Sequence, residues 1–214
     1  MAMAKYDFGI NGPFTGKLGT VVGCTWKGIP YMRSLPKKRT AKISKAEAAN
    51  RERFAIAQLW LKPLTPFLRV GFKSYQERME GFMAAKSYLL KNAVELYEGS
   101  YRVNPEKALL SYGVLAEATG VQVSIDQDHK LHCFWEPCNA RSPQAREQAM
   151  LLAYCLAEEQ AVYETHGAFR EIGHDELILP PNFIGKTVLV YLAFVAPDRE
   201  SQSRSVFLGE ILVP

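Results

Sequence analysis

The chain lacks the features that would place it in a membrane or outside the cell. No apolar run approaches the roughly eighteen residues that a membrane-spanning helix needs. Residues 1–14 contain no apolar core of the kind that a signal peptide carries. Cysteine is scarce, and its spacing does not suggest a disulfide framework: Cys24, Cys133, Cys138 and Cys155. We therefore expect a soluble, cytoplasmic protein with reduced thiols and no membrane partner.

Motifs of catalysis and cofactor binding are also missing. Gly16, Gly19 and Gly23 form neither a Gly-x-Gly-x-x-Gly pattern nor the Gly-Lys-Ser/Thr of a phosphate loop. The chain has no Gly-x-Ser-x-Gly element of the kind that presents a nucleophilic serine. The sequence therefore predicts a protein that is not an enzyme and that needs no cofactor.

Charge is distributed unevenly along the chain. Residues 1–62 hold 12 Lys and Arg against 3 Asp and Glu, whereas residues 100–214 hold 9 against 15. Hydrophobic residues make up 48% of the 214 positions, which is enough to build a proper core and argues against disorder. A basic N-terminal part and an acidic C-terminal part predict one of two things. Either the N-terminal part has a polyanionic partner, or the protein self-assembles with the N-terminal part of one copy against the C-terminal part of another.

Residues 1–36 are rich in glycine and in residues that favour strands. They predict two or three short strands, with Lys27-Gly28 at the tip of a hairpin. Because so few apolar residues lie here, we expect this piece to pack on the rest of the protein or on a neighbour.

Helix signals follow a basic linker at 37–45. Ser44 and Glu47 form a capping-box pattern, which predicts a helix that Pro63 ends. Thr65 before Pro66 predicts the cap of a second helix. The apolar run 83–97 has the length and spacing of a third helix.

The character of the chain changes at about residue 99, where short apolar runs alternate with turn residues. The run at 149–156 fits either a helix or a buried strand. Strands are predicted at 108–112, 121–125, 130–135, 160–164, 168–172, 188–195, 205–208 and 210–213. This pattern predicts a β-sandwich. We expect an α+β protein with two domains, a basic β arm plus helical region at 1–99 and an acidic antiparallel sandwich at 100–214.

Two segments carry a resemblance to a known family. Residues 16–36, GKLGTVVGCTWKGIPYMRSLP, and the following helix with Arg51, Arg53 and Phe54 resemble the N-terminal part of an uncharacterised bacterial family of about this length. Similar patterns occur in short phage and mobile-element proteins. The C-terminal part resembles the same family and a fibronectin type III or immunoglobulin-like sandwich. The resemblance implies a fold and a phage-like origin, and it lends no catalytic residues.

One cluster contains ligand types that zinc prefers: His129, His132, Cys133 and Cys138. Their spacing does not match a zinc motif, because His132 and Cys133 are adjacent and point to opposite faces of a strand. An Asp-rich turn followed by a strand explains the segment without a metal, and we expect none.

An acidic stretch with two histidines is the second candidate for chemistry. Paired carboxylates act as acid and base in hydrolases, so a hydrolase-type site near residues 166–176 is the least favoured hypothesis. Its residues are Glu158, Glu159, Glu164, His166, Glu171, His174, Asp175 and Glu176. The many turn residues around them predict a solvated surface instead.

The preferred hypothesis is a protein–protein interaction or assembly role, either with a protein partner or by self-association. Trp26, Tyr31 and Arg33 would then make the contacts. The alternative is nucleic-acid binding by residues 27–53, because basic side chains neutralise phosphates and aromatic rings stack on bases. The candidate binding residues for both roles are Trp26, Lys27, Tyr31, Arg33, Lys37, Lys38, Arg39, Arg51 and Arg53.

Overall fold

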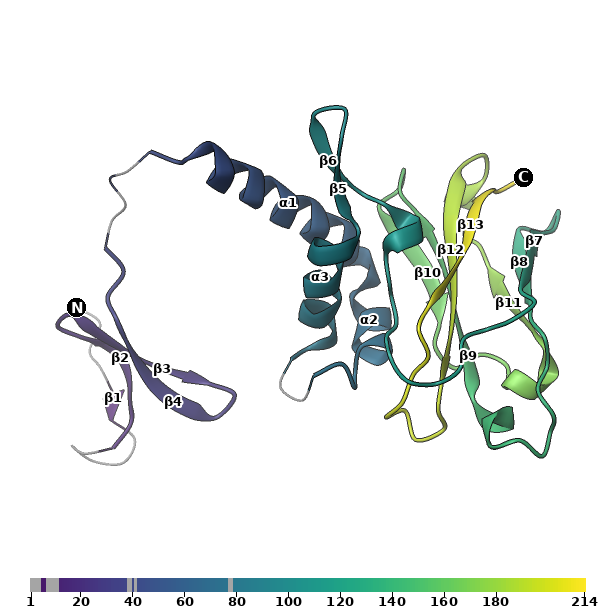
Figure 1. Ribbon diagram of the computed structural model, residues 1–214, viewed down its shortest axis with the longest axis horizontal. Helices are drawn as coiled ribbons and strands as arrows, with labels where there is room; N and C mark the ends of the chain where they lie inside the picture. The colour runs from purple at the N-terminus through teal and green to yellow at the C-terminus, as the bar shows by residue number, and fades with distance from the viewer. Residues whose placement is uncertain (1–4, 7–11, 38–39, 41, 77–78) are drawn as a thin grey trace. The chain divides into compact units, whose positions relative to one another are not determined.

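The computed structural model describes residues 5–6, 12–37, 40, 42–76 and 79–214 (Figure 1). The chain divides into two compact units, residues 1–44 and residues 45–214. The boundary expected at 99/100 therefore falls inside the second unit, since the helices share a core with the strands that follow them. The fold is α+β with antiparallel sheets, as expected.

The N-terminal unit, residues 1–44, is an antiparallel sheet with the strand order β1-β2-β3-β4. The strands are β1 (Lys5–Tyr6), β2 (Phe14–Leu18), β3 (Val21–Trp26) and β4 (Ile29–Ser34). Lys27 and Gly28 both have positive φ, 47° and 78°, as the two-residue turn between twisted strands requires. The predicted hairpin tip is confirmed.

Three α-helices open the described part of the C-terminal unit, residues 45–214. They are α1 (Lys45–Leu61), α2 (Thr65–Gly71) and α3 (Gly81–Asn92). The 3-10 turn η1 (Lys62–Leu64) joins α1 to α2. The predicted start and end of α1 are confirmed. Thr65 is not a cap, because its own backbone is already helical and its hydroxyl donates back to the carbonyl of Lys62, 2.8 Å away.

The third helix is shorter than the predicted 83–97. It ends at Asn92, and residues 94–97 instead form a strand hairpin, β5 (Val94–Tyr97) with β6 (Ser100–Val103). Glu98 and Gly99 make the turn with φ of 47° and 85°. A two-residue turn with positive φ at both positions aligns the flanking strands for pairing. The last residues of the predicted helix, 94–97, therefore form a strand.

The remaining strands form two antiparallel sheets. One has four strands in the order β10-β9-β12-β13, and the other has three in the order β11-β8-β7. Their bounds are β7 (Gln122–Ile125), β8 (Lys130–Phe134), β9 (Gln148–Cys155), β10 (Gln160–Glu164), β11 (His174–Ile178), β12 (Thr187–Val195) and β13 (Val206–Leu212). Further 3-10 turns are η2 (Pro105–Lys107), η3 (Pro143–Arg146), η4 (Arg170–Ile172) and η5 (Pro181–Phe183), so the helical elements outnumber the two or three expected.

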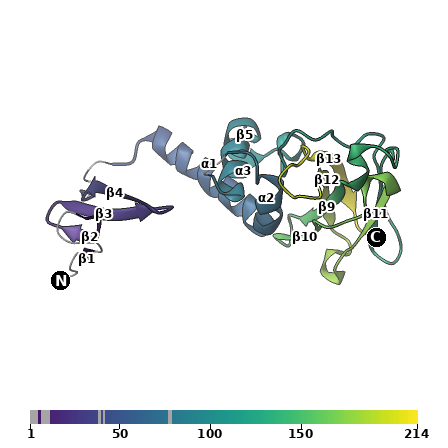
Figure 2. The same ribbon diagram turned by 90° about the horizontal axis from the view of Figure 1, so that it is seen from below.

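The four-stranded sheet of the C-terminal unit, β10-β9-β12-β13, lies between the helices and the three-stranded sheet, as Figures 1 and 2 show. Alternate residues of β9 face opposite cores: Leu152 and Tyr154 pack with the helices, whereas Leu151 and Ala153 pack with the three-stranded sheet. Both faces of β9 and β12 are therefore buried. This explains why 149–156 reads as uniformly apolar and why its secondary structure was ambiguous.

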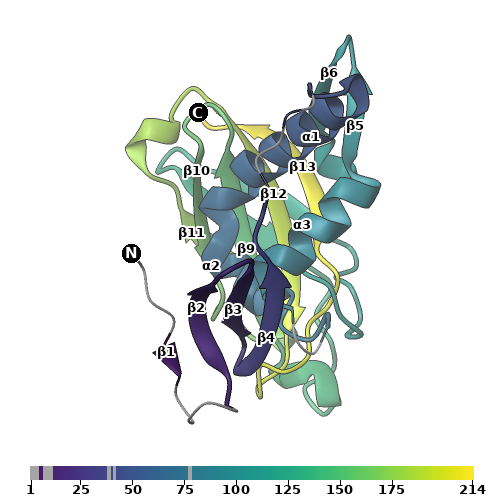
Figure 3. The same cartoon turned by 90° about the vertical axis from the view of Figure 1, so that its left-hand side faces the viewer.

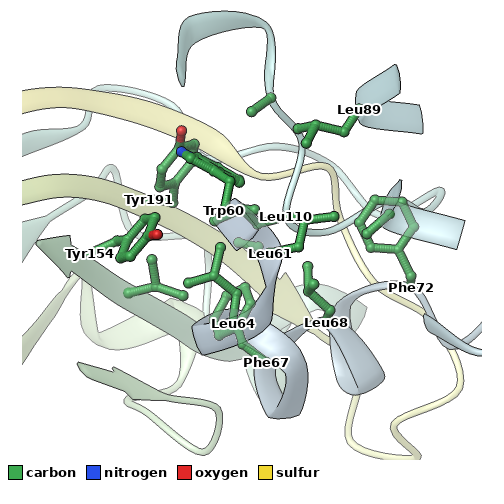
Figure 4. Close-up of a cluster of buried hydrophobic side chains, with 14 of the residues drawn as sticks. Trp60, Leu61, Leu64, Phe67, Leu68, Phe72, Leu89, Leu110, Tyr154 and Tyr191 are labelled. Carbon is green, nitrogen blue, oxygen red and sulfur yellow. The ribbon is translucent and has the colours of Figure 1, made fainter. Parts of the chain in front are cut away.

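The helices α1, α2 and α3 lie over that sheet (Figure 3), and their side chains gather in a core (Figure 4). Trp60 meets Tyr154 edge to face, with ring centroids 5.5 Å apart. Leu61, Leu64 and Phe67 lie beside them and are fully buried. No helix in the described part of the chain is long and apolar enough to cross a membrane.

Residues 108–112 do not form the expected strand. Their backbone bonds to scattered partners: Leu110 N–H donates to the Ser205 hydroxyl, and Tyr112 N–H donates to the Gly71 carbonyl. The Ser111 hydroxyl bonds to the same Gly71 carbonyl and to the carbonyl of Ser203. The apolar pattern here reflects burial among loops.

Two other strand boundaries differ from expectation. The predicted strand 168–172 is mostly the 3-10 turn η4, and the strand lies at 174–178 as β11. The segments 205–208 and 210–213 form one strand, β13, whose register against β12 shifts between Val190 and Tyr191. Gly209, with φ of 115°, lies opposite this shift and accommodates the bulge.

Candidate functional site

One face of the N-terminal sheet collects the aromatic residues that the sequence had singled out. In antiparallel strands, directly paired residues share a face. Trp26 pairs with Ile29, and Tyr31 pairs with Cys24. Lys17, Val22 and Arg33 are paired in a row across β2, β3 and β4. We call these residues the arm face: Lys17, Val22, Cys24, Trp26, Ile29, Tyr31 and Arg33.

The arm face has no core beneath it in its own unit. Among the described residues of 1–44, only Gly23 is buried, and the Phe14 ring covers it from the opposite face. Trp26 is 52% exposed, and all six residues of β4 are exposed. A sheet this small is marginally stable in water unless something covers a face, so the exposed aromatics make the arm face a candidate contact surface.

Basic side chains border the arm face. The Lys27 ammonium lies 5.5 Å from the centre of the Trp26 ring, a cation–π contact at the tip of the hairpin. Lys17 and Arg33 are exposed at the other end. Residues 1–44 hold eight Lys and Arg against one Asp, whereas residues 45–214 hold 18 against 21. The charge asymmetry therefore follows the boundary between the two units.

The other predicted binding residues do not join this face. Lys37 is exposed after β4, and Lys38 and Arg39 lie outside the described residues. Arg51 belongs to α1, where it forms an ion pair with Glu47 one turn away, at 2.7 Å. Arg53 donates to the carbonyl of Leu90 at 2.6 Å and lies over the Tyr101 ring.

Arg53 also lines a groove between α1 and α3 that the sequence did not reveal. The groove measures about 620 Å³, and Phe54, Met83 and Leu90 supply its apolar lining. Lys86 lies 4.9 Å over the Phe54 ring, and Lys91 stands at the rim. The lining of the groove thus combines apolar and basic side chains.

The zinc hypothesis is not supported by the geometry. Cys133 is fully buried in the core between the sheets, while the neighbouring His132 lies on the outer face of β8. Burial raises the pKa of the Cys133 thiol to about 12, which keeps it protonated. In the described part of the chain, no group of three or more His, Cys, Asp or Glu side chains is arranged to hold a metal ion.

His132 instead forms a linked pair with His174, 42 positions further along the chain. Their rings stack with centroids 5.6 Å apart, and His132 Nδ1 is 3.3 Å from His174 Nε2. His132 Nε2 lies 3.0 Å from Asp126 Oδ2, and this hydrogen bond, with backbone donors, holds the pKa of Asp126 below its usual range. Because Asp126 accepts, His132 donates from Nε2, and in the neutral imidazole its Nδ1 then accepts from His174.

The carboxylates of the acidic stretch each have a different set of partners. Glu158 pairs with Lys186 and Asn182, and these bonds hold its pKa below the usual range. Glu164 accepts from the backbone of the two residues that follow it. Burial raises the pKa of Asp175, which accepts the backbone N–H of Ala168 at 3.1 Å. The stretch includes strand β11, which sequence reasoning had placed on a turn-rich surface.

Comparison with known proteins confirms the coarse form of the resemblance, that of an uncharacterised family. No curated protein matches this chain. A family model described as a family of unknown function, DUF6266, matches residues 13–209, from β2 to β13. The match spans both structural units, and the chain belongs to this family of unknown function, DUF6266.

Proposed function

We propose that this protein is a non-enzymatic assembly protein that self-associates through its arm face. The observation that carries the proposal is an exposed aromatic sheet face, centred on Trp26, Ile29 and Tyr31, with no core of its own beneath it. Exposed apolar patches rimmed by polar residues mark sites of protein contact. Trp, Tyr and Arg are the residue types that dominate the energetics of such contacts.

The strands of residues 122–212 have a recognisable architecture. Seven consecutive strands, β7 to β13, form a three-stranded and a four-stranded sheet around one core. The chain crosses between the sheets after β8, β10 and β11, and hairpins join β9 to β10 and β12 to β13. We infer an immunoglobulin or fibronectin type III-like sandwich, an architecture common in cell-surface and adhesion modules. This likeness concerns the fold alone.

The test is the mass of the full-length protein in solution as a function of concentration, measured by light scattering after size-exclusion chromatography. We expect the mass to rise with concentration for the wild type. Replacing the two aromatics, Trp26→Ser with Tyr31→Ser, should weaken the association at least about tenfold, as loss of central aromatic contacts does. The matched control is Met32→Ser, because Met32 is 70% exposed on the same strand but faces the opposite side. A wild type that stays monomeric at every concentration would refute the proposal.

Nucleic-acid binding by the arm is the second candidate, favoured by the charge of residues 1–44. Exposed Lys17 and Arg33 stand beside the aromatic rings that would stack on bases. Arg51 and Arg53 are engaged within the C-terminal unit, so this role would rest on the arm. Fluorescence anisotropy with labelled DNA and RNA at two salt concentrations tests it. Affinity that falls steeply with salt and is lost with Lys17→Glu and Arg33→Glu would support it.

A further inference from the structure

The outer face of the three-stranded sheet carries an unusual row of side chains. Alternate residues of β7, β8 and β11 point away from the core, and the pairing places them side by side. Phe134 pairs with His174, and His132 pairs with Glu176. We call this surface the ladder face, and its residues are Gln122, Ser124, Lys130, His132, Phe134, His174, Glu176 and Ile178.

Three stacked rings form the centre of the ladder face. The Phe134 and His174 rings are 4.5 Å apart and nearly parallel, and the His132 ring continues the stack. Hydrogen bonds between His132 and His174 and between His132 and Asp126 orient the two imidazoles. Phe134 is 45% exposed, and Ile178 on the same face is 66% exposed. A pre-ordered aromatic surface loses little conformational entropy when a partner covers it.

Carboxylates dominate the charge around this centre. Asp126 and Asp128 lie in the turn between β7 and β8, and Glu176 projects from β11. Lys130 is the cation on the face, and it lies 3.5 Å from Glu176, which it neutralises in part. The ladder face therefore combines an aromatic centre with an acidic border.

The ladder face and the groove between α1 and α3 differ in sign of charge. The groove has an apolar lining but a border of Arg53, Lys86 and Lys91. The arm face, with Lys17, Lys27 and Arg33 around its aromatics, would be repelled by the groove and attracted by the ladder face. Of these two apolar surfaces in the described C-terminal unit, the ladder face is the one complementary to the arm.

We propose that the arm face of one copy docks on the ladder face of a second copy, an inference that rests on the assembly function proposed above. Trp26, Ile29 and Tyr31 cover the Phe134 and His174 rings and Ile178. Lys17, Lys27 and Arg33 lie against Asp126, Asp128 and Glu176. Because the two surfaces differ, each copy presents one of each, and the contact joins copies head to tail into rings or open chains.

A mixing experiment with two full-length variants tests this arrangement. The arm variant carries Trp26→Ser and Tyr31→Ser, and the ladder variant carries Phe134→Ser and Ile178→Ser, all at exposed positions. Each variant alone should be monomeric, since each lacks one of the two surfaces. Mixed in equal amounts they should form a one-to-one dimer, because the intact ladder face of one binds the intact arm of the other.

The outcomes separate the two proposals. A ladder variant that associates as the wild type does, while the arm variant does not, would overturn the docking site and leave assembly through the arm standing. An arm variant that associates as the wild type does would overturn both. A mixture that stays monomeric would overturn the head-to-tail contact.

Charge reversal provides a second route that does not alter the aromatic centre. Arg33→Glu and Glu176→Lys should each weaken the association at least about tenfold, and a mixture of the two variants should recover it through the swapped pair. Arg53→Glu alone should associate as the wild type does, since Arg53 borders the groove, and a loss of association in that variant would contradict the proposed contact. Circular dichroism of each variant checks that it is folded.

Discussion

Arg170 forms an ion pair with Glu147 although both residues are only 5% exposed. The Arg170 guanidinium also donates to the carbonyls of Ala116 and Glu117, at 2.6 and 2.8 Å, and lies 4.0 Å over the Phe194 ring. One side chain thus joins η4, the start of β9 and the loop that leads to β7. It joins these segments at one end of the two sheets.

Removing this cation should be strongly destabilising. Arg170→Met leaves the Glu147 carboxylate buried without its partner, which typically costs about 3–5 kcal/mol. The double variant Arg170→Met with Glu147→Leu should recover part of the loss, because it buries no charge. Urea unfolding of the wild type, the single variant and the double variant measures the free energy of unfolding of each. A single variant as stable as the wild type would show that the pair contributes nothing.

The cost of Arg170→Met should also depend on pH. Burial raises the pKa of Glu147, and Arg170 opposes that shift. A carboxyl with a raised folded-state pKa is destabilising once it ionises, so stability falls as pH rises above its ordinary value of 4.5. Without Arg170 this fall should be steeper. We expect the difference in free energy of unfolding between the variant and the wild type, measured with urea, to be larger at pH 7 than at pH 5.

Thiol reactivity should divide the four cysteines into two pairs. Cys133 and Cys155 are fully buried, and burial raises the pKa of Cys133 to about 12, so little thiolate forms. Cys24 and Cys138 are partly exposed. Alkylation of the native protein near pH 8, located by mass spectrometry, should label Cys24 and Cys138 first. Labelling of all four in urea serves as the control, and rapid native labelling of Cys133 would contradict the buried placement.

Gly81→Ala should destabilise the protein even though alanine favours helices. A Cβ at Gly81, the first residue of α3, would lie 2.2 Å from the carbonyl oxygen of Leu68, so the helices must move apart. Such overpacking costs about 1–3 kcal/mol. Gly99→Ala is the comparison, because a Cβ there meets open space and the cost is only that of its positive φ. Equal thermal stability of Gly81→Ala and wild type would argue against the close contact of α2 and α3.

Limited proteolysis should reveal the boundary between the two units. The described residues between Leu35 and Ser44 are all exposed, and this segment contains Lys37, Lys38, Arg39 and Lys42. Trypsin should cleave here first and leave a resistant fragment that begins between residues 38 and 46. Mass spectrometry of the fragments identifies the site. First cleavage at Arg102 or Lys107 would instead favour a boundary near residue 100.

Local patterns in the sequence predicted much of the secondary structure. Alternation at period two identified β7 and β8, a continuous apolar run identified β12, and Lys27-Gly28 identified the hairpin tip, because these signals come from residues close together in the sequence. The same alternation places Ile29, Tyr31 and Arg33 on one side of β4. The composition of the arm face was therefore accessible from the sequence.

Contacts between distant residues decided the rest. The sequence gives no sign that His174 stacks on His132, since the pairing of β11 with β8 brings them together across 42 positions. Likewise, the apolar residues at 108–112 fit a strand by pattern, but Ser111 and Leu110 find their partners in Gly71, Ser203 and Ser205.

The layers of the C-terminal unit show most clearly which features the sequence determined and which features only the tertiary structure decided. Local chemistry in the sequence set the start of α1 near Ser44, its end before Pro63 and the apolar character of β9 and β12. That the helices and the three-stranded sheet cover opposite faces of these strands was settled in the folded chain. The physical reason is that a uniformly apolar strand must be buried on both sides, yet its own residues do not specify what buries it.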